Sequence, residues 1–588
     1  MKIDKFKEKK NSINNEINQN KKILDVYVNI RLIFILALII TIISAISNAN
    51  NRTIMIIISS ILLFITIILT FLMSKYVRID KKLNYKLEVI NSYLLRFSDK
   101  YTKDNNTGLE YCEKQYFETD LDVFGRSSLY NYINFGRTPY GKKYLANSLE
   151  ANLRSKEEIE SRNKSINELS DNLDNVVDIV ASSFEYNKLN SNIDINNIES
   201  GLSALENVYK PNIFKVILSS LYIIALITVI VLQSIKLIPP YIFLIMIFIA
   251  FFLCMFINTE AAKLSDDMSQ ANHILYGYDE LIDEINKIKF NDTNLIKLQN
   301  NVSKLKSKSV KVFNVISGFS ESRKNILFQI ISNGLFMLDN YIVLAYYNWQ
   351  KKYKNNIKEA LESIGHIEEL ISLSTIGLVK ENVVNPIVSD KFEFEDIRHP
   401  LIVEEKCVPN SFIFKNTNII TGSNMSGKTT FMRSIGTNYI LFLAGAKVCA
   451  TKFEAPILKL FTSMKVVDDV NNNISTFYGE ILRIKAICDY VKLNKPMLVL
   501  VDEIFKGTNT KDRIVGAKAT IEKLNRNDIY SIVTTHDPEL CQIENVSNFH
   551  FLEYYENDEI KFDYKIHDGI SNTRNAIYLL KIAGIIDK

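Results

Sequence analysis

The chain has 588 residues, and its 70 Lys and Arg against 66 Asp and Glu give a net charge of +4. Apolar residues make up 47% and charged residues 23%, which excludes collagen-like, low-complexity and disordered chains. This charge balance neither requires nor excludes nucleic acid, because proteins that rely on phosphate contacts usually carry a larger basic excess. The six cysteines are scattered, which argues against disulfides and zinc sites and favours a reducing compartment.

Four uncharged apolar segments predict membrane spans, because each approaches the ~20 residues that cross a bilayer. The segments are residues 32–48, 53–73, 216–235 and 237–257. Short links join them in pairs, so 32–73 and 216–257 are two predicted transmembrane hairpins. The alternative, that all four are buried helices of a soluble core, is disfavoured because such helices seldom lack charge over this length.

Basic residues flank the first predicted hairpin and set its expected orientation. Residues 1–30 carry seven Lys against four acids, and five basic residues lie between Lys75 and Lys86. The positive-inside rule then places the N-terminal helix 1–31, the helical segment 74–215 and all residues after 257 in the cytoplasm. The chain is therefore predicted to be a multi-pass protein of the cell membrane.

A helical seam is predicted after the second hairpin. Apolar residues recur there at spacings of three and four, which is typical of a helix packed along another helix. Residues 258–380 are the predicted helical arm and return to the core, and two interpretations stay open for the seam helix at their start: a stiff arm that leaves the membrane, or a simple bundle helix. The seam residues are Leu264, Met268, Ala271, Leu275, Tyr278, Ile282 and Ile285.

The last two hundred residues alternate short apolar runs with helical stretches. The runs are residues 418–421, 497–501 and 530–534. This alternation predicts βα units around a parallel sheet.

A glycine-rich loop follows the first of these runs. Residues 422–429 fit the pattern GxxxxGK[ST] between a strand and a helix. The two glycines allow backbone N–H groups to wrap phosphate oxygens, Lys428 reaches the β- and γ-phosphates, and the Thr429 hydroxyl can bind Mg²⁺. The predicted nucleotide-binding residues of this loop are Gly422, Ser423, Asn424, Met425, Ser426, Gly427, Lys428, Thr429 and Thr430.

Polar residues also follow the other two runs. Asp502 and Glu503 come directly after residues 497–501. Asp502 suits the Mg²⁺ shell with Thr429, and Glu503 is placed to orient or deprotonate the attacking water. His536 follows the third run, where a γ-phosphate contact is favoured over a structural role. Glu503 and His536 are therefore the predicted catalytic residues, with ATP and Mg²⁺ as ligands.

These motifs resemble the MutS family of DNA mismatch-repair ATPases. The resemblance implies an α/β P-loop NTPase of the ABC type over residues 381–588, after a mostly α-helical core. It also implies a homodimer in which Ser475 contacts the γ-phosphate of the partner subunit and Asn424 helps to sense it. The motifs are Arg398-His399-Pro400, Val408-Pro409-Asn410, the loop from Thr421 to Arg433, Ser475-Thr476-Phe477, Asp502-Glu503-Ile504, Thr535-His536, Tyr564-Lys565 and Ala583-Gly584-Ile585.

A second, weaker resemblance covers the helical core of that family, from about residue 120. It rests on residues 137–145, 158–162 and 368–373. The stretch between the second span and this core is too short for the mismatch-reading module, and the second hairpin stands where the family has its levers and DNA clamp. Lys506 and Asn473 replace a family Arg and Gly, which bears on ATP turnover rather than on binding.

Two functions stay open. The first is a membrane-tethered MutS-type protein in which ATP closes a dimer on DNA, the client that the family implies. The second is a conformational ATPase that acts on a membrane or protein partner without DNA. An inactive scaffold is disfavoured because all the expected catalytic and binding residues are present. An ABC exporter is disfavoured because its signature segment differs and four spans are few for a translocation path.

Overall fold

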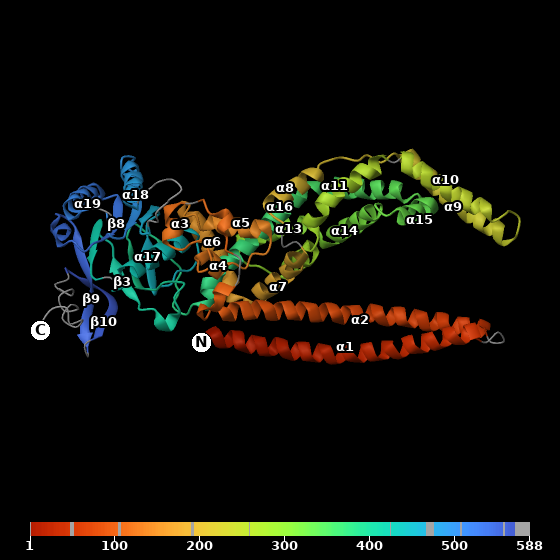
Figure 1. Ribbon diagram of the computed structural model, residues 1–588, viewed down its shortest axis with the longest axis horizontal. Helices are drawn as coiled ribbons and strands as arrows, with labels where there is room; N and C mark the ends of the chain where they lie inside the picture. The colour runs from red at the N-terminus through yellow and green to blue at the C-terminus, as the bar shows by residue number, and fades with distance from the viewer. Residues whose placement is uncertain are drawn as a thin grey trace.

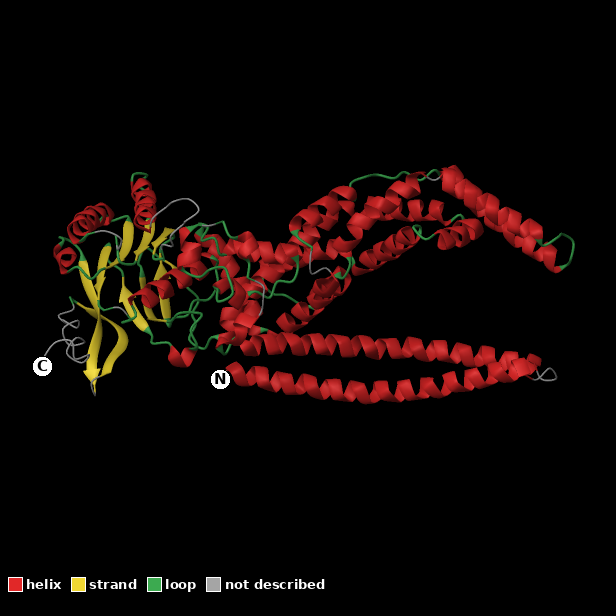
Figure 2. Cartoon of the chain, viewed as in Figure 1, coloured by secondary structure: helices red, strands yellow, loops and turns green. Residues whose placement is uncertain are grey.

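Strands gather at one end of the computed structural model, and helices form the rest of the molecule (Figure 2). A helical arm and a separate pair of long helices extend from the sheets toward the opposite end (Figure 1). The prediction of a mostly helical chain with sheets in its C-terminal part is confirmed. The structure describes residues 2–47, 52–103, 107–113, 115–189, 193–257, 259–423, 425–465, 476–505, 509–556 and 559–570.

The first two helices form a long antiparallel pair. Helix α1 (Lys2–Ser47) contains both the predicted N-terminal helix and the first predicted span, and α2 (Arg52–Leu95) likewise continues well past the second span. The Tyr27 and Tyr76 rings stack at 5.2 Å, and Ser59 Oγ donates to Thr41 Oγ1 at 3.1 Å. The apolar stretches of both helices are otherwise largely exposed, as expected for surfaces that face lipid.

Three helices of the described chain are long and apolar enough to cross a membrane: α1, α2 and α9 (Ile213–Ser234). The fourth predicted span is shorter than expected. Helix α10 (Tyr241–Ile257) has 17 residues and begins four positions after the predicted start at Leu237. The preceding link explains the difference, because Pro239 and Pro240 have no backbone N–H and Lys236 adopts a left-handed φ of 60°.

Short helices surround the arm. Two of them continue the chain after the second hairpin, and the predicted seam runs along both. All seven seam residues are buried, but Gly277, at φ +90°, divides the seam between α11 and α12. The helices of this region are α3 (Tyr116–Asp120), α4 (Leu129–Ile133), α5 (Pro139–Ser148), α6 (Lys156–Asp171), α7 (Leu173–Leu189), α8 (Ile195–Ala204), α11 (Thr259–Leu275), α12 (Tyr278–Lys287), α13 (Thr293–Lys304), α14 (Ser307–Ser322), α15 (Ile326–Phe336) and α16 (Leu338–Val379).

Helix α16 is the axis of the arm. It runs from the arm's outer end to the sheets, and its last two turns are buried on all sides. Two adjacent carboxylates fix it to the short helices. Glu368 accepts hydrogen bonds from Arg137 N (3.2 Å) and Thr138 N (3.0 Å). Glu369 pairs with Arg162 at 2.6 Å, and although burial by itself raises its pKa, Arg162 and His366 lower that pKa to about 2.

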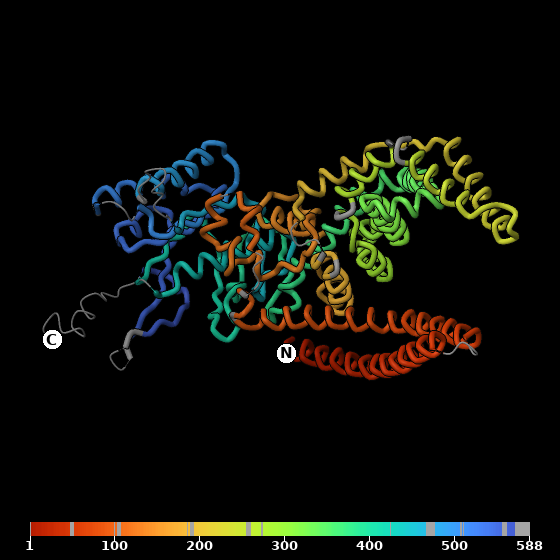
Figure 3. Tube along the Cα trace, turned by 45° about the vertical axis from the view of Figure 1, so that its right-hand side comes forward, coloured from red at the N-terminus to blue at the C-terminus, as the bar shows by residue number. Residues whose placement is uncertain are grey.

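The N-terminal end of α1 contacts the inner end of α16. Lys2 Nζ donates to Gly377 O at 2.6 Å and also to Lys380 O, which are carbonyls at the C-terminal end of α16. A cation at this position is favourable because the last carbonyls of a helix carry partial negative charge. Seen from a second direction, both apolar hairpins still extend to the end of the molecule opposite the sheets (Figure 3).

Two mixed sheets form the C-terminal part. The larger has the strand order β10-β9-β4-β8-β7-β6, in which β9, β4, β8, β7 and β6 are parallel and β10 is antiparallel to β9. The smaller has the order β1-β5-β2-β3. The strands are β1 (Ile387–Val388), β2 (Glu393–Ile397), β3 (Asn410–Ile413), β4 (Thr417–Thr421), β5 (Lys452–Ala455), β6 (Lys459–Ser463), β7 (Met497–Val501), β8 (Ile529–Thr534), β9 (Ser547–Glu556) and β10 (Glu559–Asp568).

The three predicted strands are adjacent in the larger sheet. They correspond to β4, β7 and β8, and every residue of β4 and β7 is buried. Helices α17 (Lys428–Leu443), α18 (Thr476–Val491) and α19 (Thr510–Leu524) complete this part of the chain. Because β4, β8 and β7 are parallel, their C-terminal ends lie at one edge of the sheet, where the glycine loop, the Asp502-Glu503 pair and the His536 segment begin.

Candidate nucleotide-binding site

The glycine loop joins the end of β4 to the start of α17. Gly422 has φ +149°, and a Cβ there would lie 2.9 Å from Ser426 Oγ and 3.2 Å from Phe551 O. Gly427 has φ +109° and caps α17. Both positions require glycine, because other residues rarely adopt this φ and a side chain at Gly422 has no space. At these two glycines, therefore, no side chain covers the loop backbone as it approaches the N-terminus of α17.

Lys428 lies inside the loop. Its side chain is buried, and Nζ donates to Gly422 O and to Ser423 O, both at 2.8 Å. Ser426 Oγ also donates to Ser423 O, at 2.9 Å, and so closes the turn. The loop thus surrounds an ammonium group at the positive end of a helix, which is a favourable environment for a phosphate.

The remaining predicted loop residues differ in position. Met425 is 85% exposed with φ 74°, and Thr430 is exposed on the first turn of α17. Asn424 and Ser475, which the resemblance assigned to γ-phosphate sensing, lie outside the described residues, as do Asn473 and Lys506. The predicted roles of these four residues stay predictions.

A hydroxyl and a carboxylate meet beside the loop. Thr429 Oγ1 donates to Asp502 Oδ2 at 2.7 Å, and Asp502 is 8% exposed. Hydroxyl and carboxylate oxygens are the donor set that Mg²⁺ takes beside nucleotide phosphates, and they already lie at ligand-sharing distance here. The residues present therefore fit a bound Mg²⁺.

Thr534, at the end of β8, is a site residue that sequence analysis missed. Its Oγ1 donates to Asp502 Oδ1 at 2.6 Å and accepts from Glu503 N at 2.9 Å. One hydroxyl thus fixes both carboxylates. The signal that could have identified it is the strand register, in which Val501 pairs with Val533 and the following residues consequently meet.

Glu503 and His536 face each other across the sheet edge. Their side chains meet at 3.0 Å between His536 Nε2 and Glu503 Oε1. Glu503 has a left-handed φ of 50°, a strained conformation that turns its side chain away from the strand direction. Behind His536, Asp537 accepts two hydrogen bonds from Arg513, at 2.9 and 2.7 Å, and this pairing raises the pKa of Arg513.

A cavity of about 200 Å³ opens next to the start of α17. Gly427 and Thr430 form its wall toward the loop, and Tyr564 lies on another side. Asn410 links the two flanking segments: its Nδ2 donates to Tyr564 O at 3.0 Å, and its Oδ1 accepts from Ile566 N at 2.8 Å. Three sequence motifs distant along the chain therefore converge on one side of the loop.

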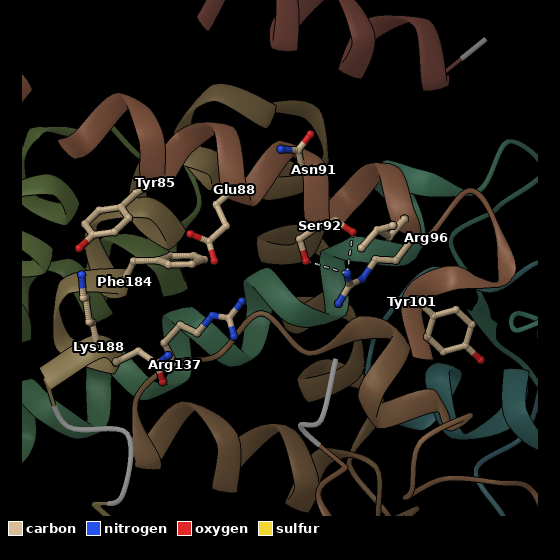
Figure 4. Close-up of a pocket in the computed structure, with 11 residues that line it drawn as sticks. Tyr85, Glu88, Asn91, Ser92, Arg96, Tyr101, Arg137, Phe184 and Lys188 are labelled. Atoms are coloured by element: carbon tan, nitrogen blue, oxygen red, sulfur yellow. Dashed lines mark hydrogen bonds between the residues drawn. The ribbon is translucent and has the colours of Figure 1, made fainter. Parts of the chain in front are cut away.

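A larger cavity lies elsewhere, between α2, α7 and the segment before α5 (Figure 4). It measures about 620 Å³ and is lined by Arg137, Phe184 and Lys188 among others. The Arg137 guanidinium lies over the Phe184 ring at 4.8 Å. None of the predicted site residues that the structure describes lines this cavity, so the candidate nucleotide site is the smaller loop region.

The segment around α3 connects the site to the helical core. Asp120, fully buried, accepts from Thr462 Oγ1 (2.7 Å), Met464 N (3.0 Å) and Lys465 N (2.9 Å). It also pairs with Arg483 of α18 at 3.0 Å. Asp122 pairs with Arg433 of α17 at 2.7 Å. Two helices that begin at predicted motifs are thus attached to the N-terminal half of the chain.

A glycine loop between a strand and a helix, beside two strand-end carboxylates, is typical of proteins that bind nucleoside triphosphates. Comparison with known proteins shows which family this region is similar to. The family model of MutS domain V matches residues 418–588. The resemblance to MutS that the motifs predicted is therefore confirmed over the C-terminal part of the chain, which is similar to MutS domain V.

Individual relatives match the same region. The DNA mismatch repair protein MutS of Thermotoga maritima is 32% identical over 249 residues, which are 40% of this chain and 31% of that protein. The protein of the same name from Haloquadratum walsbyi is 30% identical over 246 residues, which are 39% of this chain and 26% of that protein. The chain thus spans about a third of the length of the curated relatives it matches.

Proposed function

We propose that this chain is a membrane-anchored ATPase of the MutS type. The observation that carries the proposal is the single edge of the larger sheet at which Lys428, Thr429, Asp502, Glu503 and His536 lie in contact with their expected neighbours. The family match over residues 418–588 supports this proposal, in which an ABC-type P-loop ATPase occupies residues 381–588. The proposed ligands are ATP and Mg²⁺.

Each residue has a distinct task in this proposal. The N–H groups after Gly422 and the Lys428 ammonium bind phosphate oxygens, for which Lys428 exchanges its contacts with the loop carbonyls. Thr429 and Asp502 hold Mg²⁺, which neutralises charge on the phosphates when bound. Glu503 accepts a proton from the attacking water, and His536 holds the Glu503 carboxylate in position or contacts the γ-phosphate.

The cavity beside α17 is the proposed site of the nucleotide base. It adjoins the loop at Gly427 and combines apolar walls with Tyr564, which suits a flat aromatic ring. Its walls include residues of the Val408-Pro409-Asn410 and Tyr564-Lys565 motifs. In this proposal, both motifs help to form the site of the base.

The membrane anchor of the proposal consists of the apolar hairpins. Four apolar helices, three of them of spanning length, extend from the described molecule with large apolar side chains on their surfaces. Lysines flank the first hairpin, and this charge supports a cytoplasmic N-terminus and ATPase region. The proposed division follows the predicted segments 1–31, 32–73, 74–215, 216–257, 258–380 and 381–588.

Two alternative clients are proposed, DNA and a membrane or protein partner. The names of the relatives support DNA, bound by a homodimer in which Ser475 completes the partner's site. The arm supports a second candidate, a membrane or protein partner, because α16 connects the sheets directly to the second hairpin. Nucleotide-dependent closure of the dimer would move α16 relative to the bilayer in either case.

The replacement Glu503→Gln tests the catalytic assignment. We expect the purified full chain in detergent to lose at least about 10²-fold in ATP turnover, because an amide cannot accept the proton. ATP binding, measured with a fluorescent nucleotide, should persist and dimers should live longer. The exposed Glu544→Gln is the matched control, with turnover unchanged. Unchanged hydrolysis in Glu503→Gln would remove Glu503 from this role.

The same preparation distinguishes the two clients. Turnover is measured alone and with perfect, mismatched and branched duplex DNA at physiological salt, since low salt exaggerates nonspecific phosphate contacts. Stimulation by several fold supports DNA as the client, and a clear preference for mismatches contradicts the predicted loss of the mismatch-reading module. Equal turnover in all samples supports the membrane or protein partner.

A further inference from the structure

Helix α15 has its polar and apolar faces reversed relative to a soluble helix. Its exposed residues are Ile326 (62%), Leu327 (68%), Ile331 (59%) and Phe336 (49%), whereas Ser332, Asn333 and Gly334 are buried. Soluble helices bury the apolar face because water penalises its exposure. A helix that places its polar residues inward and its largest apolar residues outward is stable where the surroundings are apolar.

The contact between α15 and α10 indicates that these apolar surroundings are the lipid bilayer. A Cβ on Gly334 would lie 2.5 Å from Ile247 Cγ2, so α15 packs closely against the middle of α10. Ile247 precedes the end of α10 at Ile257 by ten residues, about 15 Å along a helix axis. That distance is about half of a hydrocarbon core ~30 Å thick. If α9 and α10 span the bilayer, the end of α15 therefore lies inside it, about 15 Å deep by α10 and about 9 Å deep by Tyr222 of α9, which bonds Gly334 O and follows the predicted span start at Val216 by six residues.

The chain bends through about a right angle at this depth. Met337 takes a left-handed φ of 46°, and α15 meets α16 at 87°. Met337 is buried against Ala250 and Cys254 of α10, with Tyr222 of α9 packed beside them. The sequence 326–350 thus runs along α15, bends at Met337 and leaves along α16, which runs toward the sheets.

Backbone N–H and C=O groups at the turn have hydrogen-bond partners within the protein, as a segment within lipid requires. Tyr222 Oη donates to Gly334 O at 2.5 Å, Met337 N donates to Asn333 O at 3.0 Å, and Asp339 N donates to Asn333 Oδ1 at 3.0 Å. The Asp339 carboxylate is in turn paired with Arg323 at 3.0 Å.

The C-terminal end of this segment carries residues typical of a lipid–water boundary, whereas at its N-terminal end Arg323 pairs with Asp339 beside the turn. Arg323 and Lys324 precede α15, and Lys351, Lys352 and Lys354 follow the first three turns of α16. Tyrosines lie between the lysines and the turn, and interfacial positions favour such aromatic and basic side chains. The apolar stripe also continues onto α14, where Val312, Val315 and Phe319 are exposed.

We infer that residues 326–350 form a re-entrant membrane segment, with the exposed face of α15 in contact with lipid acyl chains. This inference rests on the proposed membrane anchor. It differs from the sequence-based expectation that all residues after 257 lie in the cytoplasm, because the turn at Met337 would reach the bilayer core. Rearrangement of α16 would then begin inside the membrane itself.

Tryptophan fluorescence tests the inference, because the chain has one native tryptophan, Trp349, which is 4% exposed and gives a constant background. The full chain is reconstituted in phosphatidylcholine vesicles with plain or brominated acyl chains, and bromine quenches only tryptophans that contact the chains. The probe is Ile331→Trp, with Leu327→Trp as a second position on the same face. Phe248→Trp on α10 reports the anchor, and Val515→Trp on α19 reports an aqueous site.

We expect brominated lipid to remove most of the added emission of Ile331→Trp, Leu327→Trp and Phe248→Trp and to leave that of Val515→Trp unchanged. Quenching of Phe248→Trp without quenching of either α15 probe would overturn the inference and leave the anchor intact. A blue-shifted but unquenched α15 probe would show that protein, such as a second copy, covers this face. Absence of quenching at Phe248 would overturn the anchor and the inference together.

Discussion

Two side chains that no motif contains determine the geometry of the site. Thr534 holds the Asp502 and Glu503 carboxylates through one hydroxyl, and Asp120 holds the segment before α18 from a helix more than three hundred residues earlier. Neither residue would contact a nucleotide. Their effect is to limit the positions available to the residues that do, which is the usual contribution of hydrogen-bonded supporting side chains.

Replacement of Asp120 by Ala should destabilise the C-terminal part strongly. The substitution leaves the buried Arg483 without its carboxylate and removes acceptors from Met464 N and Lys465 N. Breaking such a buried pair costs about 3–5 kcal/mol. Denaturant unfolding of the full chain in detergent measures the loss. Asp171→Ala, at an exposed position of α6, is the control, and equal stability of the two variants would contradict the role of Asp120.

His399 predicts a loss of stability in mild acid. Burial, together with the nearby Arg433 and Lys380 cations, lowers its pKa from 6.5 to about 4. Its Nδ1 accepts a hydrogen bond from Leu401 N at 3.2 Å, which only the neutral ring can do. Below pH 6.5, His399 therefore binds a proton in the unfolded chain but not in the folded chain. The free energy of unfolding falls as pH drops from 6.5 toward 4, by about 3 kcal/mol.

The variant His399→Asn isolates this effect, because the amide oxygen can accept from Leu401 N but does not titrate. Melting temperatures of both proteins are compared at pH 7 and pH 4.5. We expect the difference between the two pH values to be smaller in the variant. An identical pH dependence would mean that other groups, such as the paired carboxylates, cause the acid sensitivity.

At the scale of elements, the predictions with a periodic or strand-like basis are confirmed. β4, β7 and β8 appear within one residue of the predicted runs, and the seam residues are all buried. What could not be predicted depends on contacts across the sequence. The break at Gly277 follows from the packing of Tyr186 against the turn, and the reversed faces of α15 look like an ordinary amphipathic pattern until the neighbouring helix is known.

The same limit applies to the candidate site. The glycine loop and the two carboxylates follow from local patterns, because strand, turn and helix signals lie next to them in the sequence. Thr534 and the convergence of Asn410 with Tyr564 depend on strand order and register, which local patterns do not determine. The contribution of α3 requires contacts between residues 120 and 483, beyond the reach of any local signal.

Gly277 should tolerate no side chain. A Cβ there would lie 2.8 Å from Tyr186 Cα, and φ +90° is unfavourable for alanine. Gly277→Ala is expected to lower the unfolding free energy by more than about 1 kcal/mol. Gly318→Ala, within α14 and with no atom within 4 Å of the added Cβ, should raise it by about 0.5–1 kcal/mol instead. Denaturant unfolding midpoints of both variants test this prediction, and equal shifts in the two variants would contradict it.

At the scale of the whole molecule, two separate helical connections join the sheets to the apolar end. One is the α1–α2 pair, whose first residue contacts the inner end of α16, and the other is α16 itself. Both connections meet at Gly377 and Lys380, and Lys380 precedes the first strand of the smaller sheet by seven residues. A displacement of either hairpin would therefore change the contacts at this one junction, next to the family-matched region.

The length of α1 has an electrostatic consequence. Residues 2–31 precede its apolar stretch and cover about 45 Å of helix. Ionic screening at physiological salt reduces interactions between exposed charges within about 8 Å. In the proposed arrangement, the potential of anionic lipid headgroups has decayed several times over before it reaches Lys428. Lipid composition can therefore influence the phosphate loop only mechanically, through bilayer thickness or tension, and not through its surface charge.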